Sequence, residues 1–172
     1  MPYITDHDHL RAPEAFFGGS FDFTHDLWRT GCVIFSLFFK RPPFPKRDPF
    51  SDEWRDHMLL RYQARLLGAF PSKWSPQFEM IAAESIRGGE REEWLRNSRR
   101  TAFGPRPGLL DKLFQERQMV ITKRVKESTG CPEDDCGSLG DLLPVIQGLM
   151  QHDPDCRMLP QKAAALIKWS GI

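Results

Sequence analysis

The longest apolar stretch of the chain, residues 24–39, predicts a helix that is buried on every side. After Arg29 it carries no charge, and its apolar side chains occupy all faces of a helix. Thr24 is a candidate N-cap, and Asp26 would interact favourably with the first turn. The uncharged part, Thr30 to Phe39, is about half the length that a membrane-spanning helix needs, so we expect the central helix of a water-soluble fold.

Residues 51–68 predict a second helix, because apolar side chains recur there every four residues. Ser51 is a candidate cap and Gly68 a candidate stop. The apolar positions, with Leu59 widening the stripe, are Trp54, Met58, Tyr62 and Leu66.

The rest of the chain predicts further helices and no strands. Ser75 and Pro76 open a helix to about residue 88, and residues 90–97 add another turn or two. A helix over residues 107–126 would direct five side chains toward the core: Leu110, Leu113, Phe114, Ile121 and Val125. After an acidic loop over 129–140, Ser138 or Asp141 starts a helix over 142–151, and the last helix covers 160–169. We expect one all-α domain without internal repeats.

Composition narrows the functional classes. Lys and Arg total 24 and Asp and Glu total 23, so the net charge exerts no general attraction to nucleic acid or membranes. The N-terminal stretch MPYITDHDHLRAPE lacks the basic and apolar regions of a signal peptide. Four cysteines are too few for a disulfide scaffold, and we expect a reducing compartment, the cytoplasm or nucleus.

Three clusters are candidate binding sites, and the simpler interpretation is favoured for each. Alternating ligand types in a flexible loop rarely converge on one ion, so we expect a solvated loop and no metal at Asp6, His7, Asp8 and His9. A zinc site is not expected at Cys131 and Cys136, because no second pair of Cys or His residues lies nearby in the sequence. Cys32 is expected in the core and Cys156 in a turn. Four arginines surround a Gly/Pro-rich stretch and could dock an acidic or phosphorylated peptide, but a solvated loop is favoured for Arg96, Arg99, Arg100 and Arg106.

Two segments at opposite ends of the chain resemble eukaryotic protein kinases. The first, RAPEAFFGGSFDFTHDLWRTGCVIFSLFFKRPPF (residues 11–44), is similar to the stretch from the A-P-E motif through the buried F helix to the loop before the G helix. The second, LLPVIQGLMQHDPDCRMLPQKAAALIKW (residues 142–169), is similar to the last two helices of the family and the D-P-x-x-R turn between them.

The resemblance implies a partial C-terminal lobe of a serine/threonine protein kinase, spanning residues 1–172 and lacking the β-sheet of the N-terminal lobe. It divides the chain into an activation and P+1-like segment, an F helix, a G helix, an insert and the last two helices, at residues 1–19, 24–39, 51–68, 70–138 and 139–170. Residues 52–74 are similar to the G-helix region of SR-protein kinases and their fungal relatives.

The same resemblance assigns roles to individual residues. Glu14 matches a buried glutamate and Arg157 the arginine that pairs with it through two parallel charge-assisted bonds. Asp26 matches an aspartate that accepts backbone hydrogen bonds from the catalytic loop; without that loop we expect a solvated side chain or a helix-start charge. The candidate substrate-binding residues of the P+1-like surface are His7, His9, Leu10, Arg11 and Ala12.

Departures from the family pattern put normal substrate positioning in doubt. His7 replaces the usual threonine, Leu10 the usual tyrosine, and Arg29 the usual serine. Phosphoryl transfer also needs metal-held phosphates, a lysine on them and a carboxylate to accept the hydroxyl proton. The sequence contains no G-x-G-x-x-G, V-A-I-K-like, H-R-D or D-F-G motif. The family uses ATP and magnesium; we expect no catalytic residue, metal or cofactor in this chain.

Two interpretations stay open. The chain is a kinase fragment, either a truncated gene product or part of an enzyme whose ATP-binding half is encoded elsewhere or lost. Alternatively, it is a non-catalytic module that holds a protein partner through an exposed flank of residues 24–39, the G helix (Trp54, Tyr62) or the arginine loop. Because the family packs its catalytic loop on that flank, the chain alone should bind a hydrophobic dye or be poorly soluble.

Overall fold

The computed structural model describes residues 8–45, 56–84, 91–104, 108–129 and 140–166, which form helices and loops without a strand. The longer helices are α1 Phe23–Phe39, α2 Asp56–Leu67, α3 Ser75–Glu84, α4 Arg91–Phe103, α5 Leu110–Thr129, α7 Leu142–Leu149 and α8 Pro160–Leu166. Short 3-10 turns are η1 Asp8–Leu10, η2 Pro13–Phe16, η3 Ser72–Trp74 and η5 Pro154–Cys156. The all-α prediction is confirmed.

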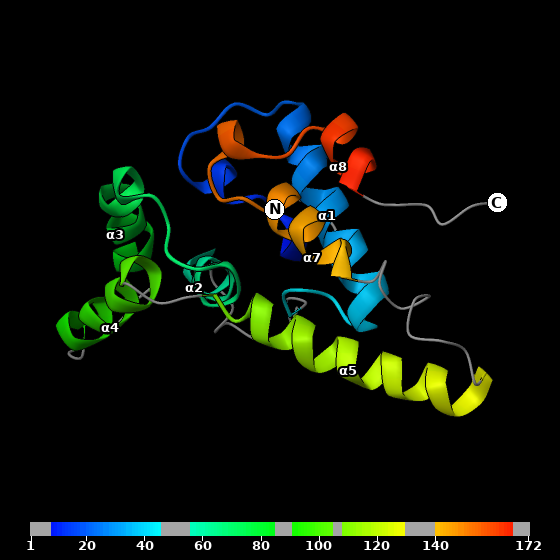
Figure 1. Ribbon diagram of the computed structural model, residues 1–172. Coiled ribbons are helices and arrows are strands. Elements are labelled where there is room, and N and C mark those ends of the chain that lie inside the picture. Colours follow the sequence, from blue (N-terminus) through cyan, green and yellow to red (C-terminus); the bar gives the residue numbers. More distant parts are fainter. Residues whose placement is uncertain (1–7, 46–55, 85–90, 105–107, 130–139, 167–172) are drawn as a thin grey trace.

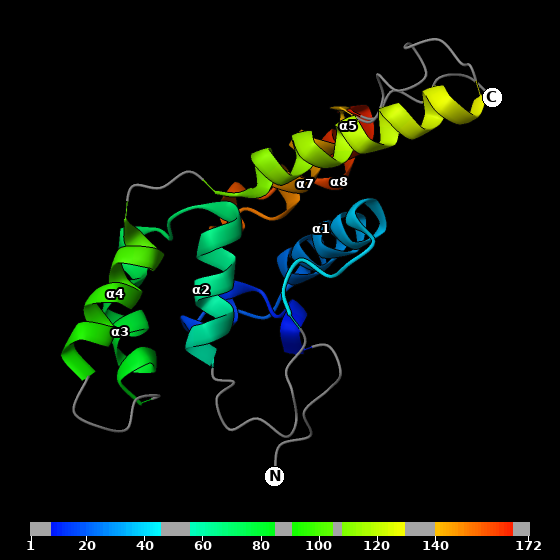
Figure 2. The ribbon, with the colours of Figure 1, turned by 90° about the horizontal axis from the view of Figure 1, so that it is seen from below.

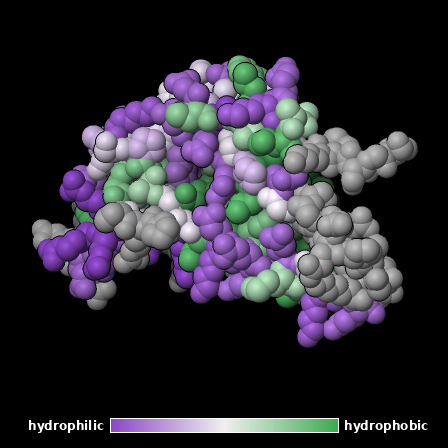
Figure 3. Space-filling view, in the orientation of Figure 1, coloured by the Kyte–Doolittle hydropathy of each residue, from purple (hydrophilic) through white to green (hydrophobic). Residues whose placement is uncertain are grey.

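The helices form two groups (Figure 1). In one, α1 packs against α7, and α7 packs against α8; in the other, α2, α3 and α4 pack against one another. Helix α5 starts beside α2 and runs away from it along the first group (Figure 2). Figure 3 shows hydrophobic residues gathered in several patches near the middle of one face, with hydrophilic residues between them.

Helix α1 begins one residue earlier than predicted because Asp22 caps it. The Asp22 carboxylate accepts hydrogen bonds from the Thr24 backbone N–H at 2.8 Å and from the Thr24 hydroxyl at 2.6 Å. These bonds hold the pKa of the Asp22 carboxyl below its usual value. The prediction of Thr24 as the cap was wrong, because Asp22 has the extended backbone of a cap and Thr24 already lies inside the helix.

Helix α1 is not buried on every side, so that prediction was wrong as well. One face is buried in the main core and carries Trp28, Cys32, Phe35 and Phe38. The opposite face is exposed, and we call it the α1 strip: Phe23, Asp26, Thr30, Val33 and Leu37. Spacings of three and four residues place these side chains on one side of the helix. The elements that pack on α1 leave this side open, and the exposed flank expected from the sequence is therefore seen among the described residues.

Gly31 allows α1 and α7 to approach closely. A Cβ atom at this position would lie 2.5 Å from Cγ of Met150 and 3.1 Å from Cβ of Leu149. Real Cβ atoms essentially never come as close as 2.5 Å, and 3.1 Å is also tight, so a larger side chain would force α1 and the end of α7 to shift. The glycine therefore fixes the spacing on the buried face of α1.

Helix α2 has a wider buried surface than the predicted stripe. Met58 and Tyr62 are only half-buried. The helix instead contributes to two cores: Leu59 and Leu66 pack on the α1 side, and Leu60 and Ala64 pack on α3 and α4. A single stripe was predicted because packing on two sides is not visible in the spacing. Gly68, with φ of 103°, ends the helix as predicted. Ser51 and Trp54 lie outside the described residues.

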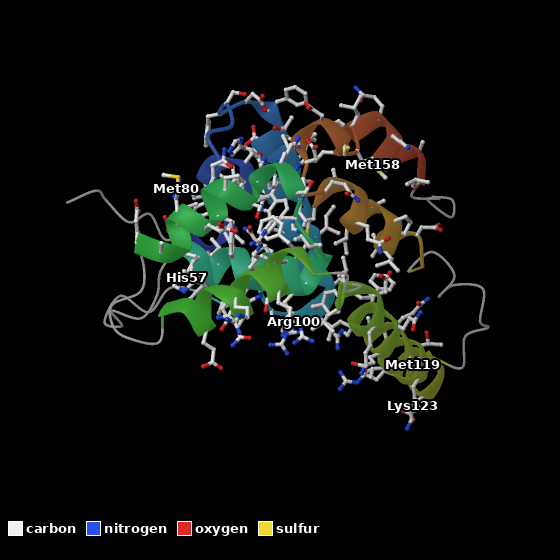
Figure 4. The ribbon with its side chains drawn as sticks, turned by 90° about the vertical axis from the view of Figure 1, so that its left-hand side faces the viewer. His57, Met80, Arg100, Met119, Lys123 and Met158 are labelled. Atoms are coloured by element: carbon white, nitrogen blue, oxygen red, sulfur yellow. The ribbon has the colours of Figure 1, made fainter. Side chains whose placement is uncertain are left out.

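Helix α4 is longer than the predicted turn or two, and it contains the arginines that were predicted in a loop. Leu95, Ser98 and Ala102 recur at helical spacing and face the core shared by α2, α3 and α4. The helix therefore continues through Arg96, Arg99 and Arg100. Arg99 Nη1 lies 3.3 Å from Oε1 of Glu79 on α3. Figure 4 shows Arg100 pointing outward from α4. Arg106 lies outside the described residues.

The remaining predicted elements differ mainly at their ends. Leu110 and Phe114 of α5 are buried, and Leu113 and Ile121 are half-buried. Ser75 is the first residue of α3 in helical conformation and not an external cap. Cys32 is a buried free thiol and Cys156 an exposed one in η5, as predicted. The side chain of Val125, the acidic loop with Cys131 and Cys136, and the end of the last predicted helix lie outside the described residues.

Candidate functional site

A buried ion pair joins the two ends of the chain. Arg157 Nη1 donates to Oε1 of Glu14 at 2.6 Å, and Nη2 donates to Oε2 at 2.5 Å. The side chains are 0% and 3% exposed. The turn η2, which begins with Pro13, positions Glu14, and the end of η5 positions Arg157. The two parallel bonds have the bidentate geometry that a lysine could not provide.

The guanidinium of Arg157 also organises the surrounding backbone. Its Nε donates to the carbonyl of Gln151 at 3.0 Å, Nη1 donates to the carbonyl of Thr24 at 2.8 Å, and Nη2 lies 3.4 Å from the carbonyl of His152. Each of its N–H groups therefore has an acceptor. One side chain thus fastens the start of α1 to the turn before α8.

Aromatic rings cover this cluster. The Arg157 guanidinium carbon lies 5.2 Å from the centre of the Trp28 ring. His152 lies 3.0 Å from the carbonyl of Gly68 through Nε2, which assigns the ring proton to Nε2. Burial lowers the pKa of His152 to about 4, and Arg157 acts in the same direction. The ring is therefore neutral near pH 7 and does not repel the guanidinium.

His25 completes the buried polar cluster. Its Nδ1 lies 3.4 Å from Oε1 of Glu14, and the side chain is 3% exposed. Burial also raises the pKa of the neighbouring Cys32 thiol, so Cys32 is not an activated nucleophile. Glu14 and Arg157 are bonded to each other and shielded from solvent, so this pair can brace the fold.

The P+1-like segment lies against α2. Gln63 of α2 is fully buried and donates from Nε2 to the carbonyl of Arg11 at 2.8 Å. Ala12 is buried and Leu10 half-buried, while Arg11 is exposed, with its guanidinium 4.2 Å above the Phe16 ring. His9 is buried; the prediction of a solvated loop was wrong for this residue because η1 packs into the fold. His7 lies outside the described residues.

Asp26 is exposed on the α1 strip, in the first turn of α1. Its backbone carbonyl accepts a hydrogen bond from the Thr30 hydroxyl at 2.7 Å, and its side chain points away from the core. The carboxylate is therefore solvent-accessible at the positive end of the helix dipole. This position fits both alternatives considered for Asp26, solvation and a helix-start charge.

Metal-ligand types do not converge in the part of the chain that the structure describes. No three His, Cys, Asp or Glu side chains there are grouped to hold an ion; Asp6 and His7 lie outside it. Within the same ranges, no helix is both long and apolar enough to cross a membrane.

The sequence interpretation missed Trp28, Gln63 and His152 as parts of these contacts. His152 directly precedes the Asp153-Pro154 turn in the second resembling segment, and that position was the available signal. The sequence contains no signal for the role of Gln63, since a glutamine on a helix is most often solvated.

Comparisons with known proteins agree with the kinase-like features. The serine/threonine-protein kinase AFC2 of Arabidopsis thaliana is 26% identical over 162 residues, which are 94% of this chain and 33% of that protein. The serine/threonine-protein kinase AFC1 of the same plant is 24% identical over 161 residues, 94% of this chain and 30% of that protein. No protein-family model matches. These likenesses support a protein-kinase-like relationship. The chain spans about a third of the length of both curated relatives.

Proposed function

We propose that this chain is a helical segment from the C-terminal lobe of a serine/threonine protein kinase and that it does not transfer phosphate by itself. The observation that carries the proposal is the buried pair of Glu14 and Arg157. The pair joins the two segments that resemble the kinase pattern, although Glu14 and Arg157 lie 143 positions apart in the sequence. The likeness to two serine/threonine kinases over 94% of the chain supports the same assignment.

The chain is expected to be inactive for a chemical reason. ATP and magnesium would need a lysine on the phosphates, metal-binding carboxylates and a carboxylate near the acceptor hydroxyl, and the sequence lacks the motifs that supply them. The carboxylates of the described residues do not gather into a magnesium-binding group, so the donor set does not fit these cofactors. Phosphorylation of serine or threonine would belong to a protein that also carries those motifs.

The finer assignments are part of the proposal. The similarity of residues 52–74 to the G-helix region supports a relationship with SR-protein kinases and their fungal relatives. Cys32 and Cys156 are free thiols, which supports an intracellular, reducing setting.

Two measurements test the proposed function. The purified 172-residue chain is incubated with labelled ATP, magnesium and an Arg/Ser-rich peptide, and no label is expected on the peptide or the chain. Its melting temperature should not change on adding ATP and magnesium. Label transfer that co-elutes with the chain on a sizing column, together with a nucleotide-dependent thermal shift, would overturn the proposal.

A second candidate function is a non-catalytic interaction module. The exposed α1 strip favours it, because Val33 and Leu37 are 51% and 66% exposed and lie on one side of a helix. The gene distinguishes the two: an in-frame sequence before Met1 that encodes H-R-D and D-F-G motifs would assign the chain to a larger kinase. A transcript confirmed to begin at Met1 would favour the module.

A further inference from the structure

A groove of about 530 Å³ lies where the end of α1, helix α2 and the start of α5 meet. Its volume is within the range of pockets that hold ligands, about 300–1,000 Å³. Phe35, Leu66 and Leu113 form apolar lining contributed by the three helices. The backbone N–H of Leu109 donates to the carbonyl of Arg65 at 3.2 Å, so the α2 and α5 walls are tied together. This bond fixes the spacing of those two walls.

The wall that follows α1 is rich in proline. Pro42, Pro43 and Pro45 line the groove, and Pro42 and Pro45 are exposed. Proline has a restricted backbone and no N–H group. This wall can contact apolar side chains with little loss of freedom, but it offers no backbone donors to a ligand. Polar recognition must come from the side chains at the rim.

That rim is positively charged. Arg41, from the segment after α1, and Arg65, from α2, line the groove and are exposed. No aspartate or glutamate is among the lining residues that the structure describes. Each guanidinium can hold a carboxylate through two parallel bonds. An apolar floor between two arginines is complementary to an apolar side chain flanked by carboxylates.

We propose that this groove is a docking site for an acidic peptide segment of a partner protein, with a large apolar side chain on the floor and Asp or Glu carboxylates on Arg41 and Arg65. The inference goes beyond the proposed function and does not depend on it, since an active and an inactive chain would present the same groove. It also concerns a surface separate from the α1 strip.

Fluorescence anisotropy tests the proposal with the full chain and a fluorescein-labelled peptide, EEDLFEDE in one-letter code. Saturable binding is expected, and it should weaken at high salt because exposed charges are screened. The neutral peptide QQNLFQNQ and the anchorless peptide EEDAAEDE should each bind about tenfold more weakly or worse. Equal binding of either control peptide would overturn the proposal.

Charge-reversed variants locate the site. Arg41→Glu/Arg65→Glu should lose about tenfold or more in affinity. The matched control Arg96→Glu/Arg100→Glu, on exposed α4, should change it by less than about twofold. Circular dichroism spectra must match those of the unchanged chain. An equal loss in both variants, or no binding by the folded unchanged chain, would overturn the proposal. A further outcome would also overturn it. If the unchanged chain binds no peptide but forms a dimer, and Arg41→Glu/Arg65→Glu dissociates that dimer, the groove holds a second copy of the chain.

Discussion

Both faces of α1 carry large apolar side chains, but these lie in opposite environments. On one face, Trp28 and Phe35 are 0% and 1% exposed, while Val33 and Leu37 on the α1 strip are more than half exposed. Composition alone would bury both faces. The difference arises because α7 and the other neighbours pack on only one of them. The hydrophobic content of a helix therefore indicates how much of its surface would gain from burial. The tertiary neighbours determine how much of that surface is buried.

The charged groups follow the same division. Glu14 and Arg157 are buried beside Trp28, whereas Asp26 is exposed on the α1 strip. Burial makes the first pair dependent on its geometry, since each charge has lost its water. Solvation leaves Asp26 with only a modest interaction with the helix dipole. Substitutions on the buried side should therefore affect folding much more than those on the strip.

The largest effect is expected from breaking the buried pair. Arg157→Ala strands the Glu14 carboxylate and should lower the free energy of unfolding by roughly 3–5 kcal/mol, measured by urea denaturation. Glu14→Leu/Arg157→Met should lose less, because neither charge remains. Arg100→Ala on exposed α4 is the control, with a change within about 0.5 kcal/mol. If Arg157→Ala were as stable as this control, the pair would not brace the fold.

The two faces of α1 can be compared directly with a pair of truncations. Phe35→Ala removes a ring that stacks on Phe39 at 4.2 Å between centroids and should cost about 3–5 kcal/mol. Leu37→Ala removes an exposed side chain and should change stability by no more than about 0.5 kcal/mol. Thermal and urea unfolding followed by circular dichroism measure both. Similar costs would show that the α1 strip is covered in solution.

His152 should make the buried side sensitive to acid. Its folded pKa of about 4 lies below the usual value of 6.5 for a histidine, so the unfolded chain binds the proton more tightly. The resulting stability is fully present above about pH 6.5 and is lost as the pH falls toward 4, by up to about 3 kcal/mol. His152→Gln, which can still donate to the Gly68 carbonyl, should lack this component. Parallel pH profiles of the two proteins would contradict the assignment.

Much of the fold was predictable because its signals are local. The apolar run of α1 and the glycine after α2 define those helices without reference to tertiary structure. The resemblance also indicated that Glu14 and Arg157 form a pair, and the structure places them together. The packing of α2 on two sides and the length of α4 were not predictable, since both depend on contacts between α2, α3 and α4. The groove likewise joins residues from α1, the segment after it, α2 and the start of α5.

The smallest effect on stability, but the clearest effect on the surface, is expected from charging the α1 strip. Val33→Lys/Leu37→Lys replaces two exposed apolar side chains and should change the free energy of unfolding by no more than about 0.5 kcal/mol. If the strip is the main exposed apolar surface, the unchanged chain should bind the dye ANS strongly and the double variant weakly. Met119→Lys/Val120→Lys is the matched control, because both side chains are exposed at the middle of α5. Equal loss of dye binding in both variants, or a compact unchanged monomer that binds no dye, would show that the strip has no special affinity for apolar ligands.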